Sequence, residues 1–139
     1  MLRHHDSNPV ADELAIRDLV ARCCDAANQH DAHRWEACWV DEDAHWDVAG
    51  HIFQGRTAVV EHWRSVTATY RFTFQMVTTG QVAVDGDRAT GRWYVQEHNE
   101  RRDGTVAELW AWYDDRYQRA AEGWRLASRV LHLVDATRR

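Results

Sequence analysis

The chain has 139 residues, of which 45% are hydrophobic and 11% aromatic, so it is long enough and apolar enough to bury a real core. The formal net charge is −5, and basic clusters are limited to Arg101-Arg102 and Arg138-Arg139, which argues against nucleic acid as a partner. All 17 basic residues are arginine, and Schiff-base chemistry is excluded because it needs a lysine amine. We expect one domain over residues 1–139, with residues 1–8 disordered and residues 135–139 frayed.

No run of residues is long and apolar enough to cross a bilayer, and no hydrophobic segment follows the first six residues. Cys23, Cys24 and Cys38 are odd in number and lack the spacing of metal ligands, which favours free thiols in a reducing compartment. We therefore expect a cytoplasmic protein without a membrane partner. The bias toward Arg, Ala, Asp and Val is typical of a GC-rich bacterial genome.

The first third of the chain predicts two helices. Asn8 can cap a helix that Pro9 opens, because proline suits the first helical position. Asp31 is placed to cap a second, short helix that runs through Trp39. Between them, apolar residues recur at helical spacing and form one stripe: Ile16, Leu19, Val20, Cys23 and Ala27.

The rest of the chain predicts a sheet interrupted by one helix. Short strands are expected over 44–48 and 52–53, and a third helix after Gly55. From Tyr70 the hydrophobic period becomes two, and Asp85-Gly86 and Asp103-Gly104 mark hairpins. Further long strands are expected over 88–101, 105–119 and 123–134. Helices on one side of a mostly antiparallel sheet make an α+β fold.

Short motifs spread over residues 14–134 carry a resemblance to a known family. They are Ile16-Arg17-Asp18-Leu19, Asp31 before Trp35, Asp43-Ala44, Gly55-Arg56-Thr57-Ala58-Val59, Val84-Asp85-Gly86-Asp87-Arg88-Ala89, Tyr113-x-Asp115-Arg116-Tyr117 and Gly123-Trp124-Arg125-Leu126-x-x-Arg129. In their order and spacing the chain resembles the SnoaL-like group of the nuclear transport factor 2-like superfamily. Relatives include polyketide cyclases, scytalone dehydratase, ketosteroid isomerase and lindane dehydrochlorinase.

The resemblance implies a cone-shaped, curved, mixed but mostly antiparallel sheet, closed by N-terminal helices around a deep apolar pocket. It also implies acid–base chemistry on small hydrophobic molecules without a cofactor. The group includes members with no known activity, so the fold does not by itself give the function.

The chain departs from the group where its chemistry is usually carried. Dehydratase- and dehydrochlorinase-like members resemble one another in an Asp near the end of the first helix and a His on the third strand. Here the first position falls on Asn28 and the second on Gln75 or Met76, none of which is a useful base at neutral pH. A position that is often Tyr or Lys in relatives is Cys23. Arg129 does match an arginine that lines the pocket in dehydrochlorinase-like members.

Glu97 is the candidate for proton transfer. One face of the strand from Arg88 carries small and apolar residues until Glu97 interrupts it, so a carboxylate there would be desolvated and its pKa raised. The alternative is a Glu97 at the rim or held in a structural ion pair.

The turn at Asp103-Gly104 decides which residues face Glu97. A two-residue loop would place Glu97 opposite Trp110 and turn His98 inward as an alternative base. A three-residue loop, with Gly104 left-handed, would place it opposite Leu109, and this is the register that the resemblance favours. Tyr113 and Arg129 would then be neighbours able to stabilise an oxyanion. The alternative for this pair is a structural hydrogen bond at the sheet edge.

Other candidates have a simpler explanation. His30 and His33 lie one turn apart, but no third metal ligand is evident, so we expect no metal. Asp31 is better explained as a helix cap than as a catalyst, and Cys23 as a buried inert thiol than as a nucleophile.

We expect Glu97, Arg129 and Tyr113 to be catalytic in a pocket for a small hydrophobic ligand. The expected substrate-binding residues are Asn28, Gln75, Met76, Trp46, Val95, Leu109, Ala111 and Leu131. Trp110 and Trp112 are expected on the outer sheet face, where a homodimer would cover them.

Three hypotheses follow. The first is a cofactor-free lyase, isomerase or cyclase acting on a small, polycyclic or aromatic metabolite, with hydrolysis by a Glu-activated water as a variant. The second is a non-catalytic binding protein that has lost the usual Asp and His. The third, weaker because many pocket positions remain polar, is a module for dimerisation or interaction only.

Overall fold

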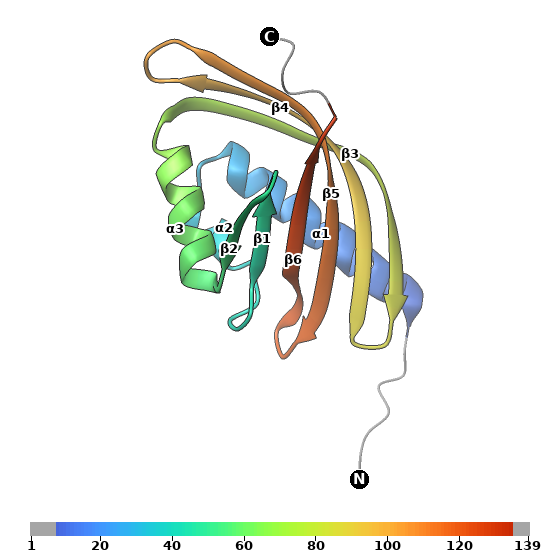
Figure 1. Ribbon diagram of the computed structural model, residues 1–139. Coiled ribbons are helices and arrows are strands. Elements are labelled where there is room, and N and C mark those ends of the chain that lie inside the picture. Colours follow the sequence, from blue (N-terminus) through green and yellow to red (C-terminus); the bar gives the residue numbers. More distant parts are fainter. Residues whose placement is uncertain (1–7, 135–139) are drawn as a thin grey trace.

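The computed structural model describes residues 8–134, so the expectations for residues 1–7 and 135–139 lie outside the described residues. Three helices pack against one six-stranded sheet (Figure 1). The helices are α1 (Pro9–Asn28), α2 (Ala32–Glu36) and α3 (Arg56–Thr67). The strands are β1 (His45–Val48), β2 (His51–Gln54), β3 (Tyr70–Asp85), β4 (Arg88–Arg101), β5 (Val106–Ala120) and β6 (Gly123–Leu133).

The sheet has the order β2-β1-β6-β5-β4-β3, in which β1 and β6 run parallel and all other neighbours antiparallel. The long strands bend strongly, and the helices lie inside the bend (Figure 1). This arrangement confirms the α+β class and the cone of mixed, mostly antiparallel sheet closed by helices. No helix within residues 8–134 is long and apolar enough to cross a membrane.

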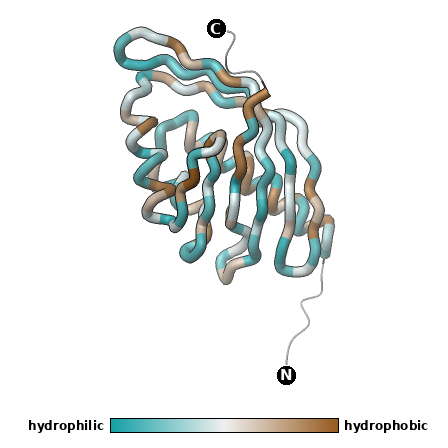
Figure 2. Tube along the Cα trace, in the orientation of Figure 1, coloured by the Kyte–Doolittle hydropathy of each residue, from teal (hydrophilic) through white to brown (hydrophobic). Residues whose placement is uncertain are grey.

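The helix ends follow from the sequence. The side chain of Asn8 accepts a hydrogen bond from the Ala11 amide, and that of Asp31 accepts one from the Arg34 amide, so both predicted caps are confirmed. The residues of the predicted α1 stripe are all buried. By contrast with this buried stripe, the tip of the β4–β5 hairpin is hydrophilic and exposed to water (Figure 2).

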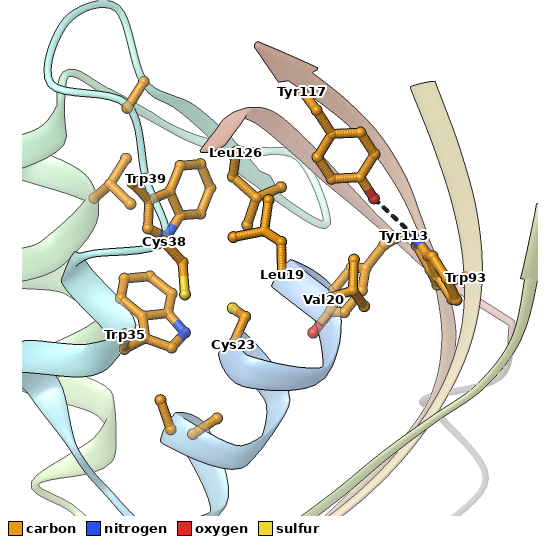
Figure 3. Close-up of a cluster of buried hydrophobic side chains, with 14 of the residues drawn as sticks. Leu19, Val20, Cys23, Trp35, Cys38, Trp39, Trp93, Tyr113, Tyr117 and Leu126 are labelled. Atoms are coloured by element: carbon orange, nitrogen blue, oxygen red, sulfur yellow. Dashed lines mark hydrogen bonds between the residues drawn. The ribbon is translucent and has the colours of Figure 1, made fainter. Parts of the chain in front are cut away.

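Tryptophans build much of the core beneath α2 and α3. Trp35 and Trp63 stack with ring centroids 4.7 Å apart, and Trp46 lies 5.5 Å from Trp35 at a tilt. Figure 3 shows Trp35 and Trp39 beside the end of α1, where Cys23 and Cys38 lie close to each other. Through these ring contacts α2, α3 and β1 pack against one another.

The β4–β5 turn takes the three-residue form. Arg101 and Thr105 close the loop through a backbone hydrogen bond of 2.8 Å, and Gly104 has a φ of 89°, as the left-handed position requires. Glu97 therefore pairs with Leu109, and Val95 with Ala111. The predicted inner face of β4 is confirmed.

In the first half of β3 the polar side chains face inward and the apolar side chains face outward, the reverse of the usual arrangement. The register shifts between Tyr70 and Phe72, as in a β-bulge, and this shift reverses which residues face inward. Thr73 and Gln75 are buried on the inner face, whereas Met76 is exposed on the outer face. The predicted place of Met76 in the pocket is therefore wrong.

Candidate active site

The inner face of the sheet, β1 and α3 enclose a cavity of about 190 Å³. Its wall is largely apolar, and the principal wall residues are Trp35, Trp46, Trp63, Val66, Leu109 and Leu131. Its polar side chains come mainly from β3, β4, β5 and β6: Thr73, Gln75, Glu97, Asn99, Tyr113 and Arg129. The cavity thus joins an aromatic wall to a set of groups capable of acid–base chemistry.

Glu97 is the acid within this cavity. It is half-buried, and removal from water raises the pKa of its carboxyl group above the ordinary range of a glutamate. Hydrogen bonds from the side chains of Asn99 and Gln75 oppose the rise, because they stabilise the carboxylate. No arginine forms an ion pair with Glu97 within the described residues. The effect of burial therefore exceeds that of the hydrogen bonds, and the pKa of Glu97 is raised.

Gln75 joins Glu97 to Tyr113. The Gln75 side-chain Nε2 lies 3.0 Å from Glu97 Oε1 and 3.0 Å from the Tyr113 hydroxyl, and donates to both. Burial raises the pKa of Tyr113 well above its usual value, although Arg129 nearby acts against the rise. Tyr113 is therefore a neutral phenol that accepts from Gln75 and keeps its own proton available for a ligand.

Arg129 lies against the ring of Tyr113 and forms a buried ion pair with Asp115. Its Nε and Nη2 each donate to one carboxylate oxygen at 2.8 Å, and Nη1 lies 3.7 Å from the Cys23 sulfur. The guanidinium carbon lies 4.0 Å from the centre of the Tyr113 ring. Burial alone would lower the pKa of Arg129, but Asp115 raises it well above its usual value. Arg129 therefore acts on the site mainly as a fixed positive charge under Tyr113.

Sequence reasoning missed Asp115. Its Oδ2 also accepts a hydrogen bond of 2.7 Å from Tyr117, which in turn accepts one of 2.8 Å from Trp93 (Figure 3). The residue alternates in phase with Tyr113 and Tyr117, so its inward direction was readable from the strand pattern. An acid on a buried face needs a cation, and Arg129 is the cross-strand partner of Asp115.

Asn28 does not line the cavity, so its predicted contact with substrate is not supported. Its Oδ1 accepts a 2.6 Å hydrogen bond from the Gln75 amide, and its Nδ2 donates to the Gln75 carbonyl at 2.9 Å. Asn28 thus holds the backbone of β3 where Gln75 can reach Glu97. Val95 and Ala111 are also absent from the cavity lining and pack in the core on the same face.

The alternative chemistries receive less support from the geometry. His98 lies on the outer face, where its Nδ1 is 2.9 Å from Glu108. His30 lies 2.8 Å from the Thr73 hydroxyl, and residues 8–134 contain no group of three or more side chains suited to hold a metal ion. A hydrogen bond with Cys38, together with burial, holds the pKa of Cys23 well above its usual value, so that thiol is not a nucleophile.

Three solved structures with this fold illustrate what the chain is similar to. A candidate aromatic ring hydroxylase from Novosphingobium aromaticivorans has a TM-score of 0.86 at 23% identity, over 93% of each chain. A candidate dehydratase of the NTF2-like family from Streptomyces avermitilis has a TM-score of 0.83 at 17% identity, over 91% of this chain and 99% of that one. The hexachlorocyclohexane dehydrochlorinase LinA-type3 from Novosphingobium barchaimii has a TM-score of 0.80 at 20% identity, over 92% of this chain and 90% of that one.

Identities this low show a common fold and no more. No curated protein matches the chain significantly. The model of one family, the SnoaL-like domain, matches residues 8–130, which is nearly the whole described chain. Together with the curved sheet and the enclosed cavity, this match shows that the chain belongs to the SnoaL-like domain family.

Proposed function

We propose that the protein is a cofactor-free acid–base enzyme, of the lyase, isomerase or cyclase type, that acts on a small hydrophobic metabolite. The observation that carries this proposal is the half-buried Glu97, which has a raised pKa and is joined through Gln75 to a neutral Tyr113 in an apolar cavity. A carboxylate in such a place is a stronger base than one in water, and perturbed acids cluster at functional sites.

The proposed step is proton removal from a carbon next to a carbonyl group. The ionised Glu97 takes the proton, and the electron pair of the C–H bond moves toward the carbonyl oxygen to form an enolate. The Tyr113 hydroxyl donates a hydrogen bond to that oxygen, while Arg129 contributes positive potential from below. Protonated Glu97 then returns its proton to the substrate or to a leaving group.

The relatives support the type of chemistry and leave its base open. The dehydrochlorinase and the candidate dehydratase are named for elimination reactions. The resemblance leads to an Asp and a His, for which this chain has Asn28 and either Gln75 or Met76, and of these two only Gln75 lines the cavity. Gln75 on β3 pairs directly with Glu97 on β4. The proposed base therefore lies on the strand next to the one that carries Gln75.

Deuterium uptake tests the proposal without knowledge of the substrate. Cyclohexanone in D₂O serves as a small carbon acid, and NMR follows exchange of the hydrogens beside its carbonyl. We expect the native protein to accelerate exchange and Glu97→Gln to lower the enzymatic rate by about a hundred- to ten-thousand-fold. Glu100→Gln, the same substitution on the outer face of β4, is the matched control and keeps the rate.

A non-catalytic binding protein is the second candidate, and the amides at Asn28 and Gln75 favour it because neither can serve as a base. Under that alternative, calorimetry would detect bound cyclohexanone while exchange stays at the uncatalysed rate. That combination of results would overturn the enzymatic proposal and leave the cavity as a binding site.

A further inference from the structure

Asn99 is a buried polar residue in the cavity to which the proposed mechanism gives no role. It lies two residues beyond Glu97 on the same face of β4, is only 1% exposed, and lines the cavity. Its side chain stabilises the Glu97 carboxylate and so opposes the rise of the Glu97 pKa. Its Oδ1 has no hydrogen-bond partner among the described residues.

Trp46, on another wall of the same cavity, has an unpaired hydrogen-bond donor where Asn99 has an unpaired acceptor. It belongs to β1, and its indole Nε1 is buried without a hydrogen-bond partner within residues 8–134. The indole ring itself packs well, with Trp35 at 5.5 Å and Phe53 at 6.3 Å between ring centroids. Packing therefore fixes the ring while its donor stays unpaired.

Unpaired buried polar atoms are rare because desolvation without a partner is costly. One acceptor and one donor in a single cavity are the pattern that a ligand of opposite polarity would complete. The cavity volume of about 190 Å³ lies below the roughly 300 Å³ at which drug-sized ligand pockets begin. The space therefore favours a ligand with one ring over a polycyclic one.

We infer that the ligand of this cavity is a single-ring-sized molecule that donates a hydrogen bond to Asn99 Oδ1 and accepts one from Trp46 Nε1. A hydroxylated carbonyl compound has both groups. The inference rests on the proposed site and deepens it: Asn99 and Trp46 determine which molecule binds, and Glu97 acts on it.

Three benzene derivatives separate the two contacts in a binding experiment. Phenol carries a donor as well as an acceptor, benzaldehyde carries only an acceptor, and toluene carries neither. Calorimetry gives the dissociation constant of each for the native protein, Asn99→Leu and Trp46→Phe. Each affinity is compared with that of toluene in the same variant, which removes changes in cavity size from the comparison.

We expect a crossed pattern. Asn99→Leu weakens phenol relative to toluene by about two- to tenfold, the range of one net hydrogen bond, and leaves the benzaldehyde ratio unchanged. Trp46→Phe weakens benzaldehyde relative to toluene and leaves the phenol ratio unchanged. Each variant is thus the control for the other. Ratios that stay constant in both variants would overturn the inference, and so would the absence of binding by all three compounds.

A crystal structure of the native protein with phenol keeps the inference testable if a variant does not fold. The phenol hydroxyl is expected within hydrogen-bond distance of Asn99 Oδ1, and any other position would contradict the assignment. Neither readout requires turnover, and Glu97→Gln is expected to retain the phenol preference. Failure of catalysis and failure of ligand selection are therefore separate results.

Discussion

Glu97 holds a carboxyl group in an apolar cavity. Ionisation of this group makes it a base, but it also lowers the free energy of unfolding. The native state holds the Glu97 proton more tightly than the unfolded chain does, because burial raises the pKa. Between the unfolded and the folded pKa, the native state therefore binds more protons. The free energy of unfolding falls as pH rises through that window, whereas the population of the basic form grows.

Replacing Glu97 with Gln should remove this pH-dependent loss. We expect Glu97→Gln to unfold at higher denaturant concentration than the native protein near neutral pH. This gain should shrink as pH falls through the window between the folded and the unfolded pKa, and vanish below the pKa of an ordinary glutamate. Denaturant titrations across pH measure both effects. Glu100→Gln is the control, and a pH dependence identical in Glu97→Gln and the native protein would show that this carboxyl group is not desolvated.

Single residues differ in how far the sequence predicts them. Glu97 was identifiable because it interrupts an apolar face whose period of two is unambiguous. Asn99 lies on the same inner face, but an amide there carries no signal of function until its hydrogen bonds are known. Asp115 was missed because it lies beside a second acid, Asp114, and only the alternation of faces separates a buried carboxylate from an exposed one.

The strand pair β5 and β6 joins Asp115 to Arg129 under the cavity floor. Both side chains are almost fully removed from water, and two parallel hydrogen bonds of 2.8 Å connect them. Breaking such a pair leaves an uncompensated buried charge, which costs more than the pair contributes relative to apolar residues. The pair therefore determines both the local stability of the sheet and the position of Arg129 under Tyr113.

Asp115→Asn should lower the free energy of unfolding by about 3–5 kcal/mol. The neighbouring Asp114 provides a matched control, because it binds Arg92 on the outer face in a partly exposed pair. We expect Asp114→Asn to cost no more than about 1 kcal/mol. Denaturant unfolding of both variants compares them directly, and equal losses would contradict the buried role of Asp115.

Elements were predicted well where turns and caps carry specific residues. The caps Asn8 and Asp31 and the left-handed Gly104 set their elements because few other residues suit those positions. The start of β3 at Tyr70 was predicted, but its inner face was not, because the bulge places apolar Phe72 and Phe74 outside and polar Gln75 inside. Hydrophobic alternation cannot detect a shift that exchanges the two faces.

The whole molecule presents an unusual number of large apolar side chains on the outer face of the sheet. Within residues 8–134, six of them expose between 38% and 50% of their surface: Phe72, Phe74, Met76, Tyr94, Val106 and Trp110. Trp112 lies on the same face, partly covered by its stacking on His132 at 4.9 Å. Large apolar side chains gathered on one exposed face favour an interaction site, and we propose a homodimer formed through this face.

Light scattering tests the homodimer at micromolar concentration. We expect a dimer for the native protein and a monomer for Trp110→Glu, because a charge in the middle of the face would be buried without a partner. Ile52→Glu changes an apolar residue that is 61% exposed on β2, at the opposite edge of the sheet from β3, and should remain dimeric. A native monomer whose indoles are accessible to a quencher would contradict the proposal.

The fold as a whole was predictable, because element order and motif spacing survive at low identity. The residues that line the cavity were harder to predict, because one turn and one bulge determine which residues face inward. The three-residue turn that the resemblance favours is confirmed, and it brings Glu97, Leu109 and Tyr113 to the inner face. The bulge was unseen, and it moved Met76 out of the cavity.

The pH dependence of deuterium exchange tests the role of Glu97 most directly. With cyclohexanone in D₂O, we expect the enzymatic rate of the native protein to rise with pH through a single titration above the ordinary range of a glutamate. Glu97→Gln should lose both the rate and the titration, while its fold and its affinity for phenol persist. A variant that exchanges hydrogen as fast as the native protein, with the same pH profile, would contradict proton transfer by Glu97.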